Sequence, residues 1–240
     1  MNPLFTSLKD FLAKPELEPA SVRSPLGHGE ADLCLKGGLQ QGVLHEVFAA
    51  IGHEAAATGF LAGLVMRVLA NKHAIWIRQD FSAHEYGELS ATGLLELGFD
   101  PERLLLLSIA NVGDALRAAN DALSCAALGA VVIEIPGSPK ILDLVASRRL
   151  TLAATQKSVT AFLLRFGAQP HASTAQTRWL VRAAPSSTDE EDWGHPFFEV
   201  DLIRNRQGKT GRWFMEWNGD ECVFQNTTAH IGTVVSASAN

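Results

Sequence analysis

The 240-residue sequence has few cysteines, a small net charge and no long apolar run, and each shortage excludes a class of protein. Its three cysteines, Cys34, Cys125 and Cys222, are far apart and outside any Cys/His spacing, which argues against a disulfide framework and a zinc site. The net charge is -6, whereas proteins that neutralise many phosphates usually carry an excess of basic residues. We therefore expect weak or no direct DNA binding.

No apolar run approaches the ~20 residues that a membrane-spanning helix needs. The N-terminus also lacks a basic stretch followed by an apolar one. We therefore expect a soluble, cytoplasmic protein that binds no membrane. With 47% hydrophobic and 19% charged residues, the chain can bury one sizeable core. We divide it into an N-terminal arm and linker (1–20), a core domain (21–235) and a flexible tail (236–240).

Residues 4–12 carry an apolar stripe at helical spacing, which predicts a short amphipathic helix. Pro15 and Pro19 then end helix formation and indicate an extended linker. Because the apolar face of the helix would otherwise be exposed, we expect it to dock on a neighbouring molecule. Folding back onto its own domain is the alternative. The predicted partner-binding stripe consists of Leu4, Phe5, Leu8, Phe11 and Leu12.

Beyond the linker, short apolar runs alternate with longer segments of helical period, which predicts a doubly wound α/β fold with a mainly parallel sheet. The expected strands are Val43–Phe48, Ala74–Ile77, Leu104–Ser108, Ala130–Ile135 and Val159–Leu164, and the expected helices are Ala55–Ala70, Ala83–Leu97, Val112–Leu128 and Ile141–Thr155. Three later β-rich runs, at 177–183, 197–204 and 212–217, predict a C-terminal antiparallel extension, with a hairpin turn at 205–209. The acidic stretch 185–193 is expected to be a solvated loop.

The loop that holds phosphate in nucleotide-binding proteins of this class keeps only one of its required groups here. Counting from Gly52 as the first glycine of G-x-x-x-x-G-K-[ST], the later positions fall on Ala57, Thr58 and Gly59. The second glycine, the lysine that reaches the phosphates and the hydroxyl that binds Mg²⁺ are absent from their places. We therefore expect no tight Mg-ATP binding, no other cofactor and no metal site.

Two carboxylates stand where a nucleotide site would place its acidic groups. Glu134 ends one apolar run, and Asp80 follows another. Without the lysine and the metal, we interpret both as structural, because each can cap the next segment or pair with Arg78 or Lys140. No Ser/His/Asp or Cys/His constellation can be assembled, so we expect no catalytic residue.

A set of linked motifs resembles one family. The motifs are His45-Glu46-Val47-Phe48, Ala56-Ala57-Thr58-Gly59-Phe60, Gly98-Phe99-Asp100-Pro101-Glu102-Arg103-Leu104-Leu105, Ala146-Ser147-Arg148-Arg149-Leu150, Thr177-Arg178-Trp179 and Leu202-Ile203-Arg204-Asn205-Arg206-Gln207-Gly208. Together they are similar to the ImuA family of inducible-mutagenesis proteins, a branch of the RecA-like superfamily, over roughly residues 25 to 218.

The resemblance implies a DNA-damage-inducible relative of RecA that acts in translesion synthesis during the SOS response. Its implied partners are a Y-family polymerase-like protein and an error-prone replicative-type polymerase, with RecA and a second copy of the chain as further candidates. Two other functions stay open. One is an ATPase whose lysine comes from a neighbouring protomer, with Lys140 and Arg148 as candidate donors. The other is a SulA-type cell-division inhibitor.

The segments that form long DNA-contacting loops in RecA are short here, at 136–139 and 166–171, and carry little basic charge. RecA-like strand exchange is therefore not expected. One basic patch lies in and beside the predicted hairpin and consists of Arg204, Arg206, Lys209 and Arg212. We interpret it as a solvated hairpin.

Overall fold

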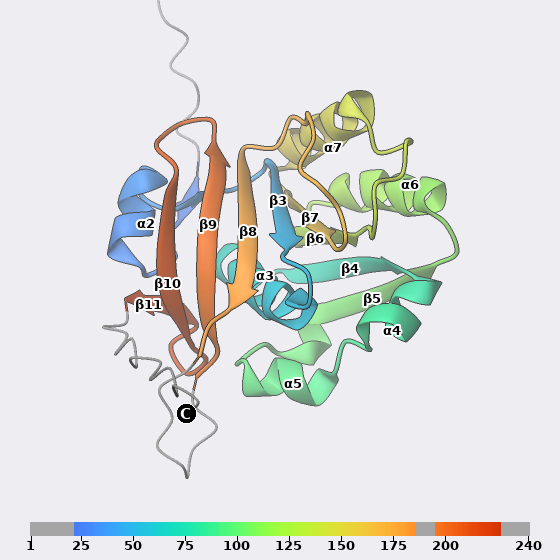
Figure 1. Ribbon diagram of the computed structural model, residues 1–240. Coiled ribbons are helices and arrows are strands. Elements are labelled where there is room, and N and C mark those ends of the chain that lie inside the picture. The colour runs from blue at the N-terminus through green and yellow to red at the C-terminus, as the bar shows by residue number, and fades with distance from the viewer. Residues whose placement is uncertain (1–21, 186–194, 227–240) are drawn as a thin grey trace, which may run out of the picture.

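The computed structural model describes residues 22–185 and 195–226. The predicted arm at 4–12, most of the predicted acidic loop and the predicted tail from residue 236 lie outside these ranges and stay predictions. The described residues build a nine-stranded sheet in the order β11-β10-β9-β8-β3-β7-β6-β4-β5, with helices on both faces (Figure 1). The sheet is strongly twisted, so that β4 and β5 run nearly across the direction of β9 and β10 in this view.

Six neighbouring strands are parallel and confirm the predicted doubly wound sheet. They are β3 (Leu44–Ala49), β4 (His73–Gln79), β5 (Leu104–Ile109), β6 (Leu128–Glu134), β7 (Thr160–Arg165) and β8 (Thr177–Ala183). Every residue of β3 and β7 is buried. Such strands are covered on both faces, which explains why most of their residues are apolar on consecutive positions.

Three antiparallel strands extend the sheet beyond β8. They are β9 (Phe197–Asn205), β10 (Gly211–Asn218) and β11 (Val223–Asn226), and the predicted hairpin turn joins β9 to β10. The predicted extension needs one correction, because its first run, β8, pairs in parallel with β3 and antiparallel only with β9. The sequence analysis missed β11, whose four residues are too few to show a period.

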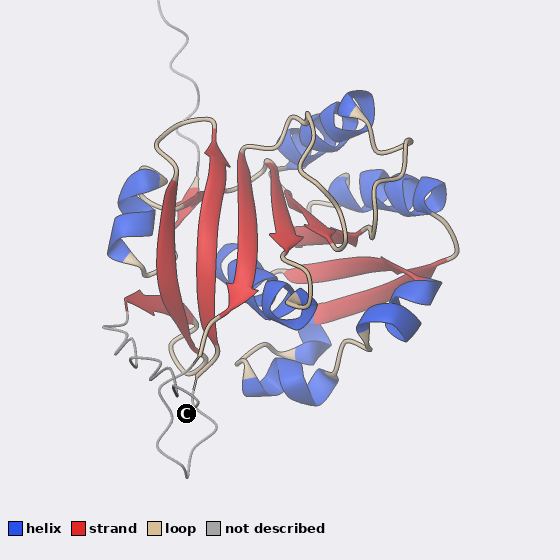
Figure 2. Cartoon of the chain, viewed as in Figure 1, coloured by secondary structure: helices blue, strands red, loops and turns tan. Residues whose placement is uncertain are grey.

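Helices cover the two faces of the sheet unequally (Figure 2). The long α3 (Glu54–Leu69) packs on one face, with α4 (Asp80–Tyr86) and α5 (Ala91–Glu96) nearby, whereas α6 (Val112–Leu123) and α7 (Leu144–Lys157) pack on the other. The predicted helix Ala83–Leu97 is wrong as a single element. Gly87 ends α4 at a φ of 86°, which favours glycine, and the Ser90 side chain caps α5.

A small substructure precedes β3 and was not predicted. Strand β1 (Arg23–Ser24) pairs with β2 (Leu39–Gln40), and α2 (Gly29–Cys34) lies between them. A short 3-10 helix, η1 (Pro101–Arg103), leads into β5. A side chain at Gly38 would lie 2.3 Å from the Ser24 carbonyl oxygen, so only glycine fits this crossing of the chain.

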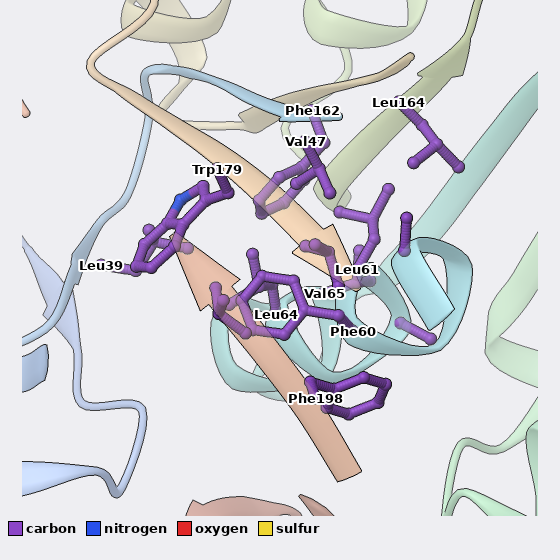
Figure 3. Close-up of a cluster of buried hydrophobic side chains, with 14 of the residues drawn as sticks. Leu39, Val47, Phe60, Leu61, Leu64, Val65, Phe162, Leu164, Trp179 and Phe198 are labelled. Carbon is purple, nitrogen blue, oxygen red and sulfur yellow. The ribbon is translucent and has the colours of Figure 1, made fainter. Parts of the chain in front are cut away.

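The larger of two apolar clusters lies between α3 and the sheet (Figure 3). Phe60 of α3 lies at its centre, with ring centroids 5.7 Å from Trp179 and 5.8 Å from Phe198. The second cluster lies under α6 and α7. Within the described ranges, no helix combines the length and apolar character needed to cross a membrane.

Candidate functional site

The connection from β3 to α3, where a phosphate-binding loop would lie, has only four residues, Ala50–His53. It is closed by a hydrogen bond from the His53 backbone N–H to the Ala50 carbonyl oxygen at 3.0 Å. The Ala183 backbone N–H donates to His53 Nδ1 at 3.0 Å, which attaches the connection to the end of β8. Gly52 sits at a φ of 78°, so its role here is to turn the chain.

The other three predicted loop positions lie inside α3 and not in a loop. Ala57 is fully buried, and Thr58 Oγ1 donates to the Glu54 carbonyl oxygen at 3.0 Å, so the hydroxyl serves the helix itself. The Glu54 carboxylate lies at the first turn of α3, where its Oε1 accepts a hydrogen bond from the Gly52 backbone N–H at 3.4 Å. A carboxylate at this end already provides the negative charge that the helix dipole favours.

Glu134, at the end of β6, forms a buried ion pair with Arg78 of β4. Arg78 Nη2 lies 3.1 Å from Glu134 Oε1, and the two side chains are 5% and 4% exposed. Trp76 Nε1 donates to the other oxygen, Oε2, at 3.1 Å, while Arg78 Nη2 also donates to the Gly87 carbonyl oxygen at 2.9 Å. Both carboxylate oxygens therefore already have protein donors.

The structure brings some of the predicted residues together and separates others. Thr58, Gly59, Glu134 and Arg78 line one cavity of about 270 Å³ between α3, α5 and the sheet. Gly52, Ala57 and Asp80 are not among its lining residues, and Asp80 is exposed as the first residue of α4. The predicted remnant is thus divided, with Thr58, Gly59 and Glu134 at this cavity, Ala57 buried in the core, and Gly52 and Asp80 on the surface.

These groups do not fit Mg-ATP. The four-residue connection is shorter than a loop that wraps phosphates, and none of its residues is a lysine. Glu134 faces a guanidinium where a metal-binding carboxylate would face the ion. What remains is the N-terminal end of α3, whose dipole contributes on the order of 1 kcal/mol to anion binding.

A second buried charged cluster lies across the neighbouring strands β8, β3 and β7. Arg178 Nε donates to Glu46 Oε2 at 2.7 Å, and the Phe48 ring lies between the guanidinium groups of Arg165 and Arg178, 5.6 and 5.8 Å from its centre. Burial lowers the pKa of Arg165 to about 10; the nearby Glu46 raises it and Arg178 lowers it further. The arginine remains charged at neutral pH.

These two arginines hold down the short loops that follow β6 and β7. Arg165 donates to the carbonyl oxygens of Ile135 and Gly137 at 3.1 and 2.7 Å. Arg178 donates to the His171 carbonyl oxygen at 2.6 Å. The sequence analysis did not group these residues, although a charged residue inside an otherwise apolar strand was the available signal.

The basic hairpin patch is partly engaged by its own domain. Arg206 donates to the carbonyl oxygens of Ala175 and Ser173 at 3.0 and 3.1 Å, and Arg212 pairs with Asp201 at 3.2 Å. Burial, followed by the nearby charges of Arg206 and Arg178, lowers the pKa of Arg204. Contacts of this kind reduce the positive charge that the patch presents to a phosphate backbone.

The strand order and the helices on both faces define an α/β protein consistent with a RecA-like fold, with a connection of four residues between β3 and α3. No family model matches the chain. Protein ImuA of Caulobacter vibrioides is 31% identical to it over 221 residues, which cover 82% of this chain and 86% of that protein, in strain NA1000 / CB15N and in strain ATCC 19089 / CIP 103742 / CB 15. This chain belongs to the ImuA family.

Proposed function

We propose that the protein is a non-catalytic, RecA-like adaptor in DNA-damage-induced translesion synthesis. It binds a Y-family polymerase-like protein and, through it, an error-prone replicative-type polymerase. Membership of the ImuA family supports the process. The observation that carries the non-catalytic role is the ion pair of Glu134 with Arg78 beside a connection of four residues, because together they remove both the phosphate cradle and the metal ligand.

We expect the purified protein to bind ATP with a dissociation constant no tighter than about 1 mM and to hydrolyse none. The reason is that only the N-terminal end of α3 remains to bind the phosphates, whereas tight ATP binding needs a lysine, a metal ion and a phosphate-binding loop together. Titration with a fluorescent ATP analogue in Mg²⁺ measures this directly. Micromolar affinity, or turnover that is lost on Asp80→Asn, would instead support an ATPase with an unorthodox site.

The surface that supports partner binding is the outer edge of β5, the last strand of the sheet in the described part of the chain. Leu105 and Leu106 are 62% and 40% exposed. Edge strands are normally shielded by charges, prolines or bulges, and this one presents consecutive leucines. An extended segment of a partner can pair with such an edge through backbone hydrogen bonds and cover the leucines. We propose that the polymerase-like partner binds here.

Replacing Leu105 by lysine should reduce partner recovery by at least about tenfold, because losing one well-packed contact of about 1.4 kcal/mol has this effect. The measurement is affinity capture from DNA-damaged cells with wild type and variant, followed by identification of the captured proteins. Leu33→Lys on α2 is the matched control, since Leu33 is 80% exposed and lies far along the chain from β5. Equal recovery by both variants would place the partner elsewhere, and a captured cell-division protein would contradict the proposed process.

A further inference from the structure

A groove of about 680 Å³ lies on the surface between α6 and α7. Its floor and walls include Leu116, Ile141, Val145 and Leu150. Ile141 and Val145 are 55% and 57% exposed, which is a large apolar surface for the helical layer of a globular domain. Charged residues of both signs lie at its rim, namely Asp121, Asp143, Arg117 and Arg149. Of these four, only Arg117 forms an ion pair among the described residues, with Asp114.

The described chain begins beside the C-terminal end of α7. The backbone N–H of Gln41 donates to the Val22 carbonyl oxygen at 2.9 Å. One residue further on, the Gly42 carbonyl oxygen accepts a hydrogen bond from Thr155 Oγ1 in the last turns of α7 at 3.2 Å. Whatever precedes Val22 is therefore attached within a few residues of the helix that forms one wall of the groove.

The length of the preceding chain matches the distance to the groove. Thr155 and Val145 are ten positions apart in α7, which corresponds to ~15 Å along the helix axis. Residues 13–21 span up to ~30 Å when extended, so residues 4–12 can reach the groove of their own chain. A tether of this length gives an effective concentration on the order of millimolar, which favours docking within one chain over docking on a second copy.

We propose that residues 4–12 fold back onto their own domain instead of docking on a neighbouring molecule, and form an amphipathic helix that occupies the α6–α7 groove of their own chain. The apolar stripe Leu4, Phe5, Leu8, Phe11 and Leu12 covers Ile141 and Val145, as a helix in a groove does. Lys9 then lies near Asp121 and Asp143, whose carboxylates form no ion pair within residues 22–185 and 195–226, and Asp10 lies near Arg149. This docking does not depend on whether the protein binds ATP or on whether a partner binds the β5 edge.

The test is disulfide formation between two introduced cysteines in the full-length chain, with Cys34, Cys125 and Cys222 replaced by serine. We expect Leu8→Cys with Val145→Cys to form an intramolecular disulfide under mild oxidation, seen as a monomer of increased mobility on a non-reducing gel. In a chain that carries Val145→Cys alone, the docked arm should lower the rate at which this thiol reacts with a maleimide by at least about tenfold. Deleting residues 1–14 should restore the higher rate.

The matched control is Leu8→Cys with Leu33→Cys. Leu33 is 80% exposed, and its helix α2 also ends near the start of the described chain, because Arg23 Nη1 donates to the Leu35 carbonyl oxygen at 2.6 Å. A random tether would form both disulfides at similar rates, and that result would overturn the proposal. A disulfide-linked dimer would also overturn it, by showing that the groove receives the arm of a second copy. Failure of the Val145 pair to crosslink would overturn it as well.

Discussion

Replacing Arg78 by methionine is expected to lower the free energy of unfolding by roughly 3–5 kcal/mol. The substitution keeps most of the side-chain volume but leaves the Glu134 carboxylate buried without its cation, at a site where both side chains are at most 5% exposed. Burying an uncompensated charge costs far more than the ion pair itself contributes, because the carboxylate has already lost its water. Urea unfolding of the wild type and the variant measures the difference.

The double variant Arg78→Met with Glu134→Gln provides the control for this experiment. Glutamine keeps an oxygen for the Trp76 N–H, so only the charge is removed. We expect the double variant to be more stable than Arg78→Met alone, since neither partner is left charged in the interior. If Arg78→Met costs less than about 1 kcal/mol, Glu134 is not neutralised by Arg78. The Glu134 carboxylate would then be available to a metal ion.

Lowering the pH from 6.5 to 4 is expected to destabilise the protein through one buried histidine, His45. Its ring is fully buried in β3, and Nε2 donates to the Gln40 carbonyl oxygen at 2.8 Å. Since a carbonyl can only accept, Nδ1 is the unprotonated nitrogen, and it accepts from Thr177 Oγ1 at 2.7 Å. The Thr177 oxygen accepts in turn from Trp179 Nε1 at 2.8 Å. Protonating Nδ1 would break this chain of hydrogen bonds.

Burial is the main cause that lowers the pKa of His45 to about 4, from an unfolded value of 6.5; the Gln40 carbonyl raises it and Arg23 lowers it. The unfolded chain therefore binds a proton at a pH where the folded protein does not. The stability contributed by neutral His45 is fully present above pH 6.5 and is lost as the pH falls toward 4, where the loss levels off. Integrated over this range, the loss is roughly 3 kcal/mol.

Unfolding by urea at a series of pH values, with wild type and His45→Gln, measures this loss. Glutamine can donate to the Gln40 carbonyl but does not titrate, so its profile should be flatter between pH 4 and 6.5. Some slope will remain, because burial also lowers the pKa of His28, although Glu30 and other nearby acceptors oppose the shift. Parallel profiles for the two proteins would show that His45 is not the origin of the acid sensitivity.

The sequence predicted the sheet well wherever a strand is covered on both faces. The runs at β3, β6 and β7 are largely apolar because helices pack on each side of them, and their few charged residues, among them Glu46, Glu134 and Arg165, are buried as well. The long segment at 83–97 was misread because its helical period continues through Gly87, and a period says nothing about the backbone conformation of one glycine. The sequence did not predict the direction of β8 either, since an apolar run fits a parallel or an antiparallel strand.

For the candidate site as well, the sequence predicted some features and not others. Counting residues predicted that Ala57, Thr58 and Gly59 do not replace the glycine, lysine and hydroxyl of a phosphate-binding loop, and this stays a prediction. Counting did not show that α3 begins at Glu54 and shortens the connection to four residues. The β5 edge was likewise not found, because its leucines look like any buried strand until the strand order places them last.

Composition and periodicity by themselves determined the fold class and the alternation of strands and helices from β3 to β7. These properties are local, since each depends on residue types within one short stretch of chain. Only the tertiary structure decided which charges meet. Arg78 and Glu134 are 56 positions apart, and Glu46 and Arg178 are 132 apart. Their pairing follows from strand order and register, which are set by packing of the whole sheet and not by the residues beside each charge.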